Sequence, residues 1–362
     1  MKAYSILLCG LAIFSTTIFG SCSQKKAVAE PIIDLPRAET PAEVETAAQN
    51  YIAEMDSTKN VRLHSLMILK HGEVIYENWV NEGHPDSAHV MFSVSKTFTA
   101  TAIGFAISEG KLKLTDKLVD IFPDKLPEEV GENLAAVTVR DLLTMTCGQE
   151  EDVQTIWGRG ADPNADWVKE FLAAPYPHKP GTWYFYNSLG SFMLSAIAQK
   201  VTGEKVLDYL MPRLFDKLHI ARPRYDENPQ GINLGGWGLY LKTEDMAKMG
   251  QLFLQNGMWN GEQVVPAEWI AEASAYQVPC CPSGTRPDEI EAKGLTKENS
   301  FWMWGYCYQM WRCPDNAYRA DGLGGQYIIV FPDKDAVVIS TAGTQDLQKG
   351  LEILWRHIVP VL

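Results

Sequence analysis

The chain has 362 residues, of which 46% are hydrophobic and 21% are charged, and its formal net charge at pH 7 is -13. This composition is typical of a globular protein with enough apolar residues for a core, and the length predicts one large domain or two lobes. The acidic charge argues against nucleic acid as a partner, because a nucleic-acid surface needs a basic face. The sequence has no zinc-ligand spacing and no Walker loop, so neither a metal site nor a nucleotide cofactor is expected.

The N-terminal segment has the features of a bacterial export signal. Lys2 gives it a basic start, and residues 6–19 form an apolar stretch interrupted by small and hydroxyl residues. The stretch is too short and too mixed to predict a membrane span. Small residues precede Cys22, which resembles the lipobox of bacterial lipoproteins, in which the cysteine is acylated. An ordinary cleaved signal with an incidental cysteine is the alternative.

Residues 1–21 are therefore predicted to be a lipoprotein signal peptide, Cys22 the lipidation site and residues 22–39 a tether. The protein is expected in the bacterial cell envelope, facing the periplasm, with its only membrane contact through the lipid anchor. Export implies an oxidising compartment. Four cysteines of the C-terminal half then allow a disulfide or remain buried free thiols, and the sequence leaves both open: Cys280, Cys281, Cys307 and Cys313.

Residues 40–362 are predicted to form one domain in which helical and strand patterns follow in chain order. The expected elements are a helix after a capping box at 40–43, a hairpin of strands at 63–70 and 73–80, a helix at 93–110, short helices at 139–145, 166–173 and 191–201, a helix at 243–256, strands at 325–331 and 336–341, and a helix at 345–359. This order predicts an α+β fold, with an antiparallel β-sheet flanked by N- and C-terminal helices and an inserted, mainly helical lobe at roughly residues 100–225. A cleft between the lobes is the expected place for a site.

A serine and a lysine three residues apart, Ser93 and Lys96, mark the start of the helix predicted at 93–110. The same spacing occurs at residues 23–26 and 108–111, but the first lies in the tether and the second runs past a helix end. Residues i and i+3 share a helix face, so an unprotonated Lys96 can activate Ser93 as a nucleophile. Partial burial and the positive helix end lower an amine pKa, and the Ser93 N–H is placed to bind an oxyanion. The alternative is an N-cap serine beside a solvated lysine.

A second polar cluster follows a Pro-Gly turn at residues 180–181, where Tyr186 and Ser188 precede a predicted helix. Tyr186 can exchange a proton with the serine or a leaving group if a cation such as Lys96 lowers its pKa. A tyrosine ring packed in the core, with its hydroxyl on backbone, is the commoner role.

A third cluster, Asp321 and Gly322 within the glycine-rich segment 319–326, leads into a strand. Glycines there permit close backbone approach, and an N–H at such an edge can be a second oxyanion donor. A tight glycine-rich turn explains these residues equally well. The tryptophans of the chain are more often packing residues, but four of them are candidates for lining a pocket: Trp157, Trp302, Trp304 and Trp311.

The order of these three clusters resembles the serine hydrolases of the class C β-lactamase and penicillin-binding-protein superfamily. Segments 235–250 and 256–261 also match, and the resemblance covers the chain from about residue 40 to its end. It implies a metal-free acyl-enzyme mechanism without cofactors. The roles that it implies are nucleophile for Ser93, proton transfer for Lys96 and Tyr186, oxyanion hole for the backbone N–H groups of Ser93 and Leu323, and substrate binding for Ser188, Asp321 and Gly322.

Two positions depart from the pattern of true β-lactamases. Ser188 stands where their second motif has asparagine, and the segment at Asp321 lacks the lysine or histidine that would bind a substrate carboxylate. The combination resembles the esterase and amide-hydrolase branch, which includes the 6-aminohexanoate-dimer hydrolase group, and predicts weak or absent β-lactamase activity. A small molecule or short peptide is the expected substrate. The alternatives are a D-amino-acid peptidase or cell-wall carboxypeptidase of the same fold, and a catalytically inactive binding lipoprotein.

Overall fold

The computed structural model describes residues 34–156 and 162–362, together with Met1. The predicted signal peptide, Cys22 and most of the tether lie outside the described residues, as does Trp157. Within the described ranges no helix combines the length and the apolar character that crossing a bilayer requires.

The secondary structure of the described residues alternates as the sequence predicts, with additional short elements. The strands are β1 Leu63–Lys70, β2 Glu73–Trp79, β3 His89–Val90, β4 Tyr240–Leu241, β5 Met258–Trp259, β6 Glu262–Gln263, β7 Trp311–Arg312, β8 Tyr318–Gly322, β9 Gln326–Phe331 and β10 Ala336–Ala342. The helices are α1 Ala42–Ser57, α2 Ser95–Ser108, α3 Leu118–Ile121, α4 Glu132–Ala136, α5 Val139–Leu143, α6 Trp167–Ala173, α7 Ser188–Thr202, α8 Val206–Leu210, α9 Thr243–Leu254, α10 Ala267–Ser274 and α11 Leu347–His357. The remaining helical turns are η1 Phe92–Val94, η2 Met211–Phe215, η3 Pro287–Glu289, η4 Pro332–Lys334 and η5 Val359–Val361.

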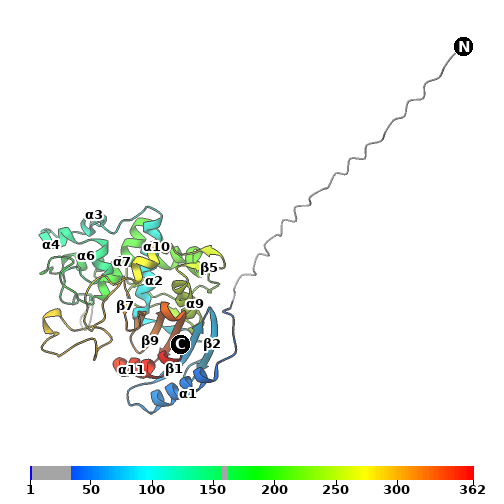
Figure 1. Ribbon diagram of the computed structural model, residues 1–362. Coiled ribbons are helices and arrows are strands. Elements are labelled where there is room, and N and C mark those ends of the chain that lie inside the picture. The colour runs from blue at the N-terminus through cyan, green and yellow to red at the C-terminus, as the bar shows by residue number, and fades with distance from the viewer. Residues whose placement is uncertain (2–33, 157–161) are drawn as a thin grey trace. The chain divides into compact units, whose positions relative to one another are not determined.

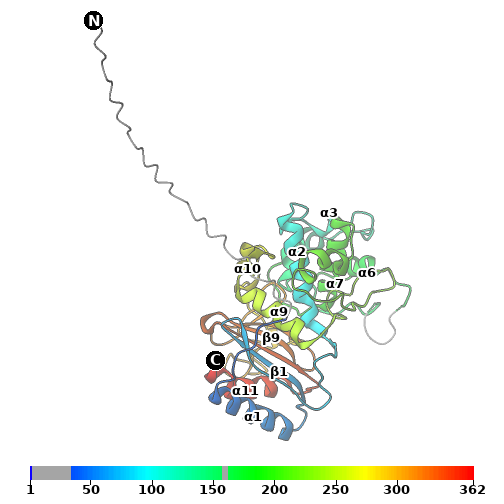
Figure 2. The ribbon, with the colours of Figure 1, turned by 90° about the vertical axis from the view of Figure 1, so that its right-hand side faces the viewer.

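A six-stranded antiparallel sheet, in the order β2-β1-β10-β9-β8-β7, forms the centre of the fold. Helices α1 and α11 cover one face, while α9 and then α2 and α7 lie on the other side (Figures 1 and 2). Because β1 pairs with β10, the N-terminal and C-terminal parts of residues 34–362 build the same layer. This arrangement confirms the α+β fold predicted from the sequence.

The central strands β9 and β10 are mostly apolar and are buried along their whole length, because both faces of the sheet are covered. In β1, Leu66 and Ile68 belong to the core under α1 and α11, whereas Met67 and Leu69 belong to the core on the opposite face. Successive side chains of a strand point to opposite faces, so alternate residues supply the two cores. The sheet is thus fixed from both sides, and the end of β8 becomes a rigid support for the site described below.

Several boundaries differ from the prediction for identifiable reasons. The predicted capping box at residues 40–43 is wrong: α1 begins at Ala42, and its N-cap residue is Pro41, which makes no side-chain cap hydrogen bond. The predicted hairpin is confirmed, with β2 ending at Trp79. The glycine-rich segment 319–326, for which the sequence left a tight turn as an equally good alternative, begins with residues of a fully buried strand, Tyr318–Gly322. All five described cysteines are buried free thiols. Of the two possibilities that the sequence left open for Cys280, Cys281, Cys307 and Cys313, the structure therefore shows free thiols and no disulfide.

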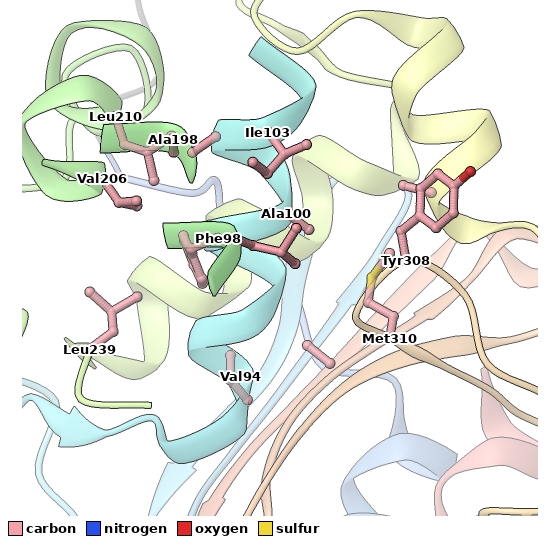
Figure 3. Close-up of a cluster of buried hydrophobic side chains, with 14 of the residues drawn as sticks. Val94, Phe98, Ala100, Ile103, Ala198, Val206, Leu210, Leu239, Tyr308 and Met310 are labelled. Atoms are coloured by element: carbon pink, nitrogen blue, oxygen red, sulfur yellow. The ribbon is translucent and has the colours of Figure 1, made fainter. Parts of the chain in front are cut away.

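Helix α2 is buried almost all round, which makes it a fixed platform for the residues at its start. Its apolar side chains, such as Phe98 and Ile103, pack among Ala198 and Leu210 on one side, while Tyr308 lies on the other side (Figure 3). A helix that is apolar around its whole circumference belongs in the interior. The position of the Ser93–Lys96 segment is therefore set by core packing.

Candidate active site

Ser93 lies in η1, immediately before α2, so the predicted helix at 93–110 begins as a 3-10 turn and becomes α-helical only at Ser95. Phe92, the residue before it, has φ 44°, in the left-handed region that a side chain rarely adopts. Such a conformation costs about 1–3 kcal/mol and persists only where the surrounding structure holds it. It turns the chain so that Ser93 lines a cavity of about 550 Å³.

Lys96 is buried, with 1% of its surface exposed, and its Nζ makes polar contacts to three groups. As an ammonium it donates to Ser93 Oγ at 2.9 Å, to Ser188 Oγ at 3.1 Å and to the carbonyl oxygen of Gly236 at 2.7 Å. A neutral amine has two N–H donors and one lone pair. If Gly236 and Ser188 take the donors, the lone pair is left for the Ser93 hydroxyl, which is the orientation that a general base needs.

The segment that carries the Gly236 carbonyl is held against α2 by hydroxyl side chains. The Leu239 N–H donates to Ser95 Oγ at 3.2 Å, and Thr99 Oγ1 donates to the Gly235 carbonyl at 2.8 Å. A Cβ added to Gly236 would lie 2.6 Å from the Ser188 carbonyl oxygen, so only glycine allows this approach. The sequence reasoning noted this segment only as a family match and missed its contact with Lys96.

Burial lowers the pKa of the Lys96 amine to about 7, although Asp152 and Asp321 act in the opposite direction. Removing an ammonium from water disfavours its charged form. The lysine is thus poised to be deprotonated near neutral pH, as a general base requires.

We expect kcat/KM for a neutral ester to rise with pH through about 7 and then to level, because only the deprotonated amine accepts the proton from Ser93. A pH–rate profile measured on the purified protein tests this. A profile that stays flat from pH 6 to pH 9 would be inconsistent with Lys96 as the base.

The Tyr186 ring also lies next to Lys96, with its centroid 5.0 Å from Nζ. The ring stacks on Trp311, and the two ring centroids are 5.4 Å apart. Burial raises the pKa of the Tyr186 phenol, and an interaction with the Ser93 hydroxyl opposes part of that rise. The expectation that Lys96 lowers the tyrosine pKa is therefore not met. Burial also lowers the pKa of the Lys96 amine, so near neutral pH the positive charge that was to stabilise a phenolate is reduced.

The turn from β8 to β9 brings the third cluster to the same cavity. A Cβ at Gly322 would lie 2.4 Å from the Met91 carbonyl oxygen, so the absent side chain allows β8 to approach η1 closely. The next residue, Leu323, is 62% exposed and lines the cavity together with Ser93. The backbone N–H groups of these two residues are thus candidates for one oxyanion hole.

Asp321 lines the cavity from the end of β8 and is held from behind. Its Oδ2 accepts from Trp302 Nε1 at 3.1 Å and from Arg319 Nε at 2.9 Å. Arg319 is fully buried and also donates from Nη1 to the Phe301 carbonyl at 3.2 Å. Burial raises the pKa of the Asp321 carboxyl, whereas the neighbouring guanidinium lowers it. The sequence singled out Asp321 but gave no signal for its partner.

Asn187, which stands between Tyr186 and Ser188, has a structural role. Its Oδ1 accepts from the Gly190 N–H at 2.9 Å as the N-cap of α7, and its Nδ2 donates to Gln149 Oε1 at 2.7 Å. The cap sets the first turn of α7, from which Ser188 reaches Lys96.

Two of the four tryptophans that the sequence suggested as pocket residues line the cavity. Trp302 and Trp311 line the cavity, together with Trp237, whereas Trp304 borders a separate surface hollow. Within residues 34–156 and 162–362, no three His, Cys, Asp or Glu side chains are grouped so that they could hold a metal ion.

The sequence and the fold were compared with those of known proteins. The sequence matches the family described as Beta-lactamase over residues 48–359. It is 25% identical over 297 residues, which are 78% of this chain and 73% of the relative, to the 6-aminohexanoate-dimer hydrolase of Paenarthrobacter ureafaciens. The fold is similar to that of EstCE1, described as a hydrolase with promiscuous acyltransferase activity, with a TM-score of 0.68, 14% identity and coverage of 87% of this chain and 98% of that one. A penicillin-binding protein homologue from Caulobacter crescentus matches with a TM-score of 0.64, 15% identity and coverage of 88% and 99%.

Proposed function

The chain belongs to the Beta-lactamase family of serine hydrolases, and from that premise we propose that it is an esterase or amide hydrolase working through an acyl-enzyme on Ser93. The observation that carries the proposal is the contact of the Ser93 hydroxyl with a buried amine whose pKa lies near 7. A solvated lysine, the alternative weighed from the sequence, would stay protonated at neutral pH and could not take a proton.

In the proposed reaction, Ser93 Oγ attacks the substrate carbonyl carbon while its proton moves to Lys96 Nζ. The oxyanion of the tetrahedral intermediate is stabilised by the N–H groups of Ser93 and Leu323. The bond to the leaving alcohol or amine then breaks, and that group takes up a proton from Lys96 or through Tyr186. A water molecule attacks the acyl-enzyme with Lys96 again as base, which releases the acid and restores Ser93.

Tyr186, with its raised pKa, is assigned the role of a neutral proton donor and relay. We expect Tyr186→Phe to lower kcat/KM for an anilide or alkyl ester by about 10²–10⁴-fold, the range typical of general acid catalysis. It should lower kcat/KM for a p-nitrophenyl ester much less, because p-nitrophenolate leaves without a proton. Parallel kinetics on the two substrate types measure this split, and equal losses on both would remove Tyr186 from the leaving-group step.

A labelling experiment tests the proposed function directly. A fluorophosphonate probe followed by peptide mass spectrometry should place one adduct on Ser93. A substrate panel of p-nitrophenyl esters, short amide oligomers, D-alanyl peptides and a chromogenic cephalosporin then separates the branches of the family. No adduct and no turnover from a folded sample would support the inactive binding lipoprotein instead, and efficient cephalosporin hydrolysis would contradict the esterase assignment.

We also propose that the protein is exported and lipid-anchored at Cys22, on the basis of the sequence before residue 34. Metabolic labelling with palmitate and fractionation of the cell envelope test this. Label that fails to enter the protein, or a product found only in the soluble fraction, would rule out the anchor.

A further inference from the structure

The turn between β8 and β9 carries the Leu323 N–H that the proposed reaction uses as an oxyanion donor. Within residues 34–156 and 162–362, no group accepts a hydrogen bond from this N–H, so it is free for a substrate oxygen. Leu323 is largely exposed at the tip of the β8–β9 hairpin, a place where the backbone is often mobile. An oxyanion donor lowers the barrier only if it is already in position when the charge develops. The turn therefore needs a support from elsewhere in the fold.

Hydrogen bonds to the backbone carbonyls hold the turn in one conformation. The Gly325 N–H donates to the Gly322 carbonyl at 3.1 Å and closes the turn. This carbonyl belongs to the same planar peptide unit as the Leu323 N–H, so the bond also sets the direction of that N–H. The Thr344 N–H, which follows β10 in the chain, donates to the Gly324 carbonyl at 2.8 Å.

Gln326, the residue directly after the turn, ties the turn to the end of β10. Its Nε2 donates to the Leu323 carbonyl at 3.2 Å and to the Ala342 carbonyl at 2.6 Å, while its Oε1 accepts from the Ala342 N–H at 3.2 Å. These partners fix the orientation of the amide, because a flipped amide would place its oxygen against two carbonyl oxygens. A Cβ added to Gly324 would lie 3.1 Å from Nε2, so the amide lies directly against the turn.

Strand β10 is a firm anchor for this link. It pairs with β1 on one side and β9 on the other, and all of its residues are buried. The Gln326 side chain is itself 2% exposed, so its three hydrogen bonds are shielded from competing water. The exposed tip of the hairpin is thus fixed to an interior strand of the sheet.

We propose that Gln326 is a positioning residue of the oxyanion hole, which holds the turn so that the Leu323 N–H is directed at the oxygen of the tetrahedral intermediate. The inference rests on the proposed function, since it concerns the same reaction. Gln326 is not among the described residues that line the cavity, so it acts through the turn. The competing explanation is that Gln326 only stabilises the end of the sheet.

A pair of substrates that differ in one atom tests the proposal: p-nitrophenyl acetate and its thiono analogue, in which sulfur replaces the carbonyl oxygen. Sulfur accepts hydrogen bonds weakly, so a well-placed oxyanion donor accelerates the oxygen ester more than the thiono ester. Gln326→Met keeps the length of the side chain and removes its three hydrogen bonds. We expect it to lower kcat/KM by about 10–10²-fold for the oxygen ester and by less than about threefold for the thiono ester.

Gln309→Met is the matched control, because Gln309 is also 2% exposed and makes the same kinds of contact. Its Nε2 donates to the carbonyls of Leu142 and Leu143 at 3.0 and 3.1 Å, and its Oε1 accepts from Ser191 Oγ at 2.5 Å. Both variants should lose stability, which the unfolding temperature measures, but only Gln326→Met should lower the ratio of the two rates. An unchanged ratio in folded Gln326→Met, or an equal fall in Gln309→Met, would overturn the proposal.

A measurement on the unaltered protein keeps the inference testable if Gln326→Met does not fold. Amide hydrogen exchange followed by NMR should show the N–H groups of Gly325 and Ala342 exchanging at least about 10²-fold more slowly than in an unstructured peptide. The first of them closes the turn, and the second donates to Gln326. Exchange of both at the unprotected rate would mean that the turn is not held, and the proposal would fail.

The results also separate this inference from the proposed function. A fluorophosphonate adduct on Ser93, together with an unchanged ratio in folded Gln326→Met, would reject this inference alone. A folded, unaltered protein that forms no Ser93 adduct would reject the proposed function and, with it, the role of Gln326.

Discussion

Ser93→Ala is expected to lower kcat/KM by about 10⁴-fold or more and to abolish the fluorophosphonate adduct, because it removes the hydroxyl assigned to the covalent step. Ser93 Oγ lies 2.9 Å from the Lys96 amine, and Ser93 lines the cavity. Ester turnover and intact-protein mass spectrometry on the same samples measure both effects.

The chain offers a matched control for this change. Ser108 has the same spacing to Lys111 as Ser93 has to Lys96, but it ends α2 and donates to the Phe105 carbonyl at 2.9 Å. Ser108→Ala should keep both the turnover and the adduct. If Ser93→Ala still formed the adduct, the nucleophile would have to be sought elsewhere.

Lys96→Ala is expected to lower kcat/KM by about 10²–10⁴-fold and to remove the rise of the rate through pH 7. Both follow if its amine is the base, because the variant keeps Ser93 and the oxyanion donors but has no group to accept the proton. The cavity left by the side chain should admit a small amine, so added ethylamine is expected to restore part of the rate. Rates across pH, with and without ethylamine, measure these effects.

Lys111→Ala is the control for the lysine, since Lys111 pairs at the surface with Glu109 at 2.7 Å. Its pH profile should match that of the unaltered protein. A normal rate in folded Lys96→Ala, judged by its unfolding temperature, would mean that another group activates Ser93.

The fold was predictable because its strong signals are local. Apolar runs at residues 63–70, 326–331 and 336–342 and helical periodicity at 243–254 mark elements long enough to show a pattern. The family match confirms the resemblance inferred from the motifs. Two-residue strands such as β3 and β7 escaped prediction because they hold too few residues for any period and exist through their pairing partners.

The segment 319–326 shows where local reasoning cannot choose between two structures. Its glycines allow a tight turn or a close approach beside a strand, and residues 318–322 form the buried strand β8 because they pair with β9 on one side and β7 on the other. Strand formation depends on neighbouring chains more than on intrinsic preference. The turn begins only after Gly322, where the chain passes Met91.

The candidate chemistry could be inferred from the order of the residues, since the Ser93–Lys96 spacing, Tyr186 and the glycine-rich segment carry the family resemblance. Their meeting at one cavity, the Gly236 carbonyl on Lys96 and the buried Arg319 behind Asp321 were decided by the tertiary structure alone. The tertiary structure also decides how the two pKa values shift, because burial lowers the pKa of Lys96 and raises that of Tyr186. Desolvation and long-range hydrogen bonds depend on the groups that surround a residue in space. Lys96 and Gly236 are 140 positions apart, and no local sequence pattern predicts their hydrogen bond.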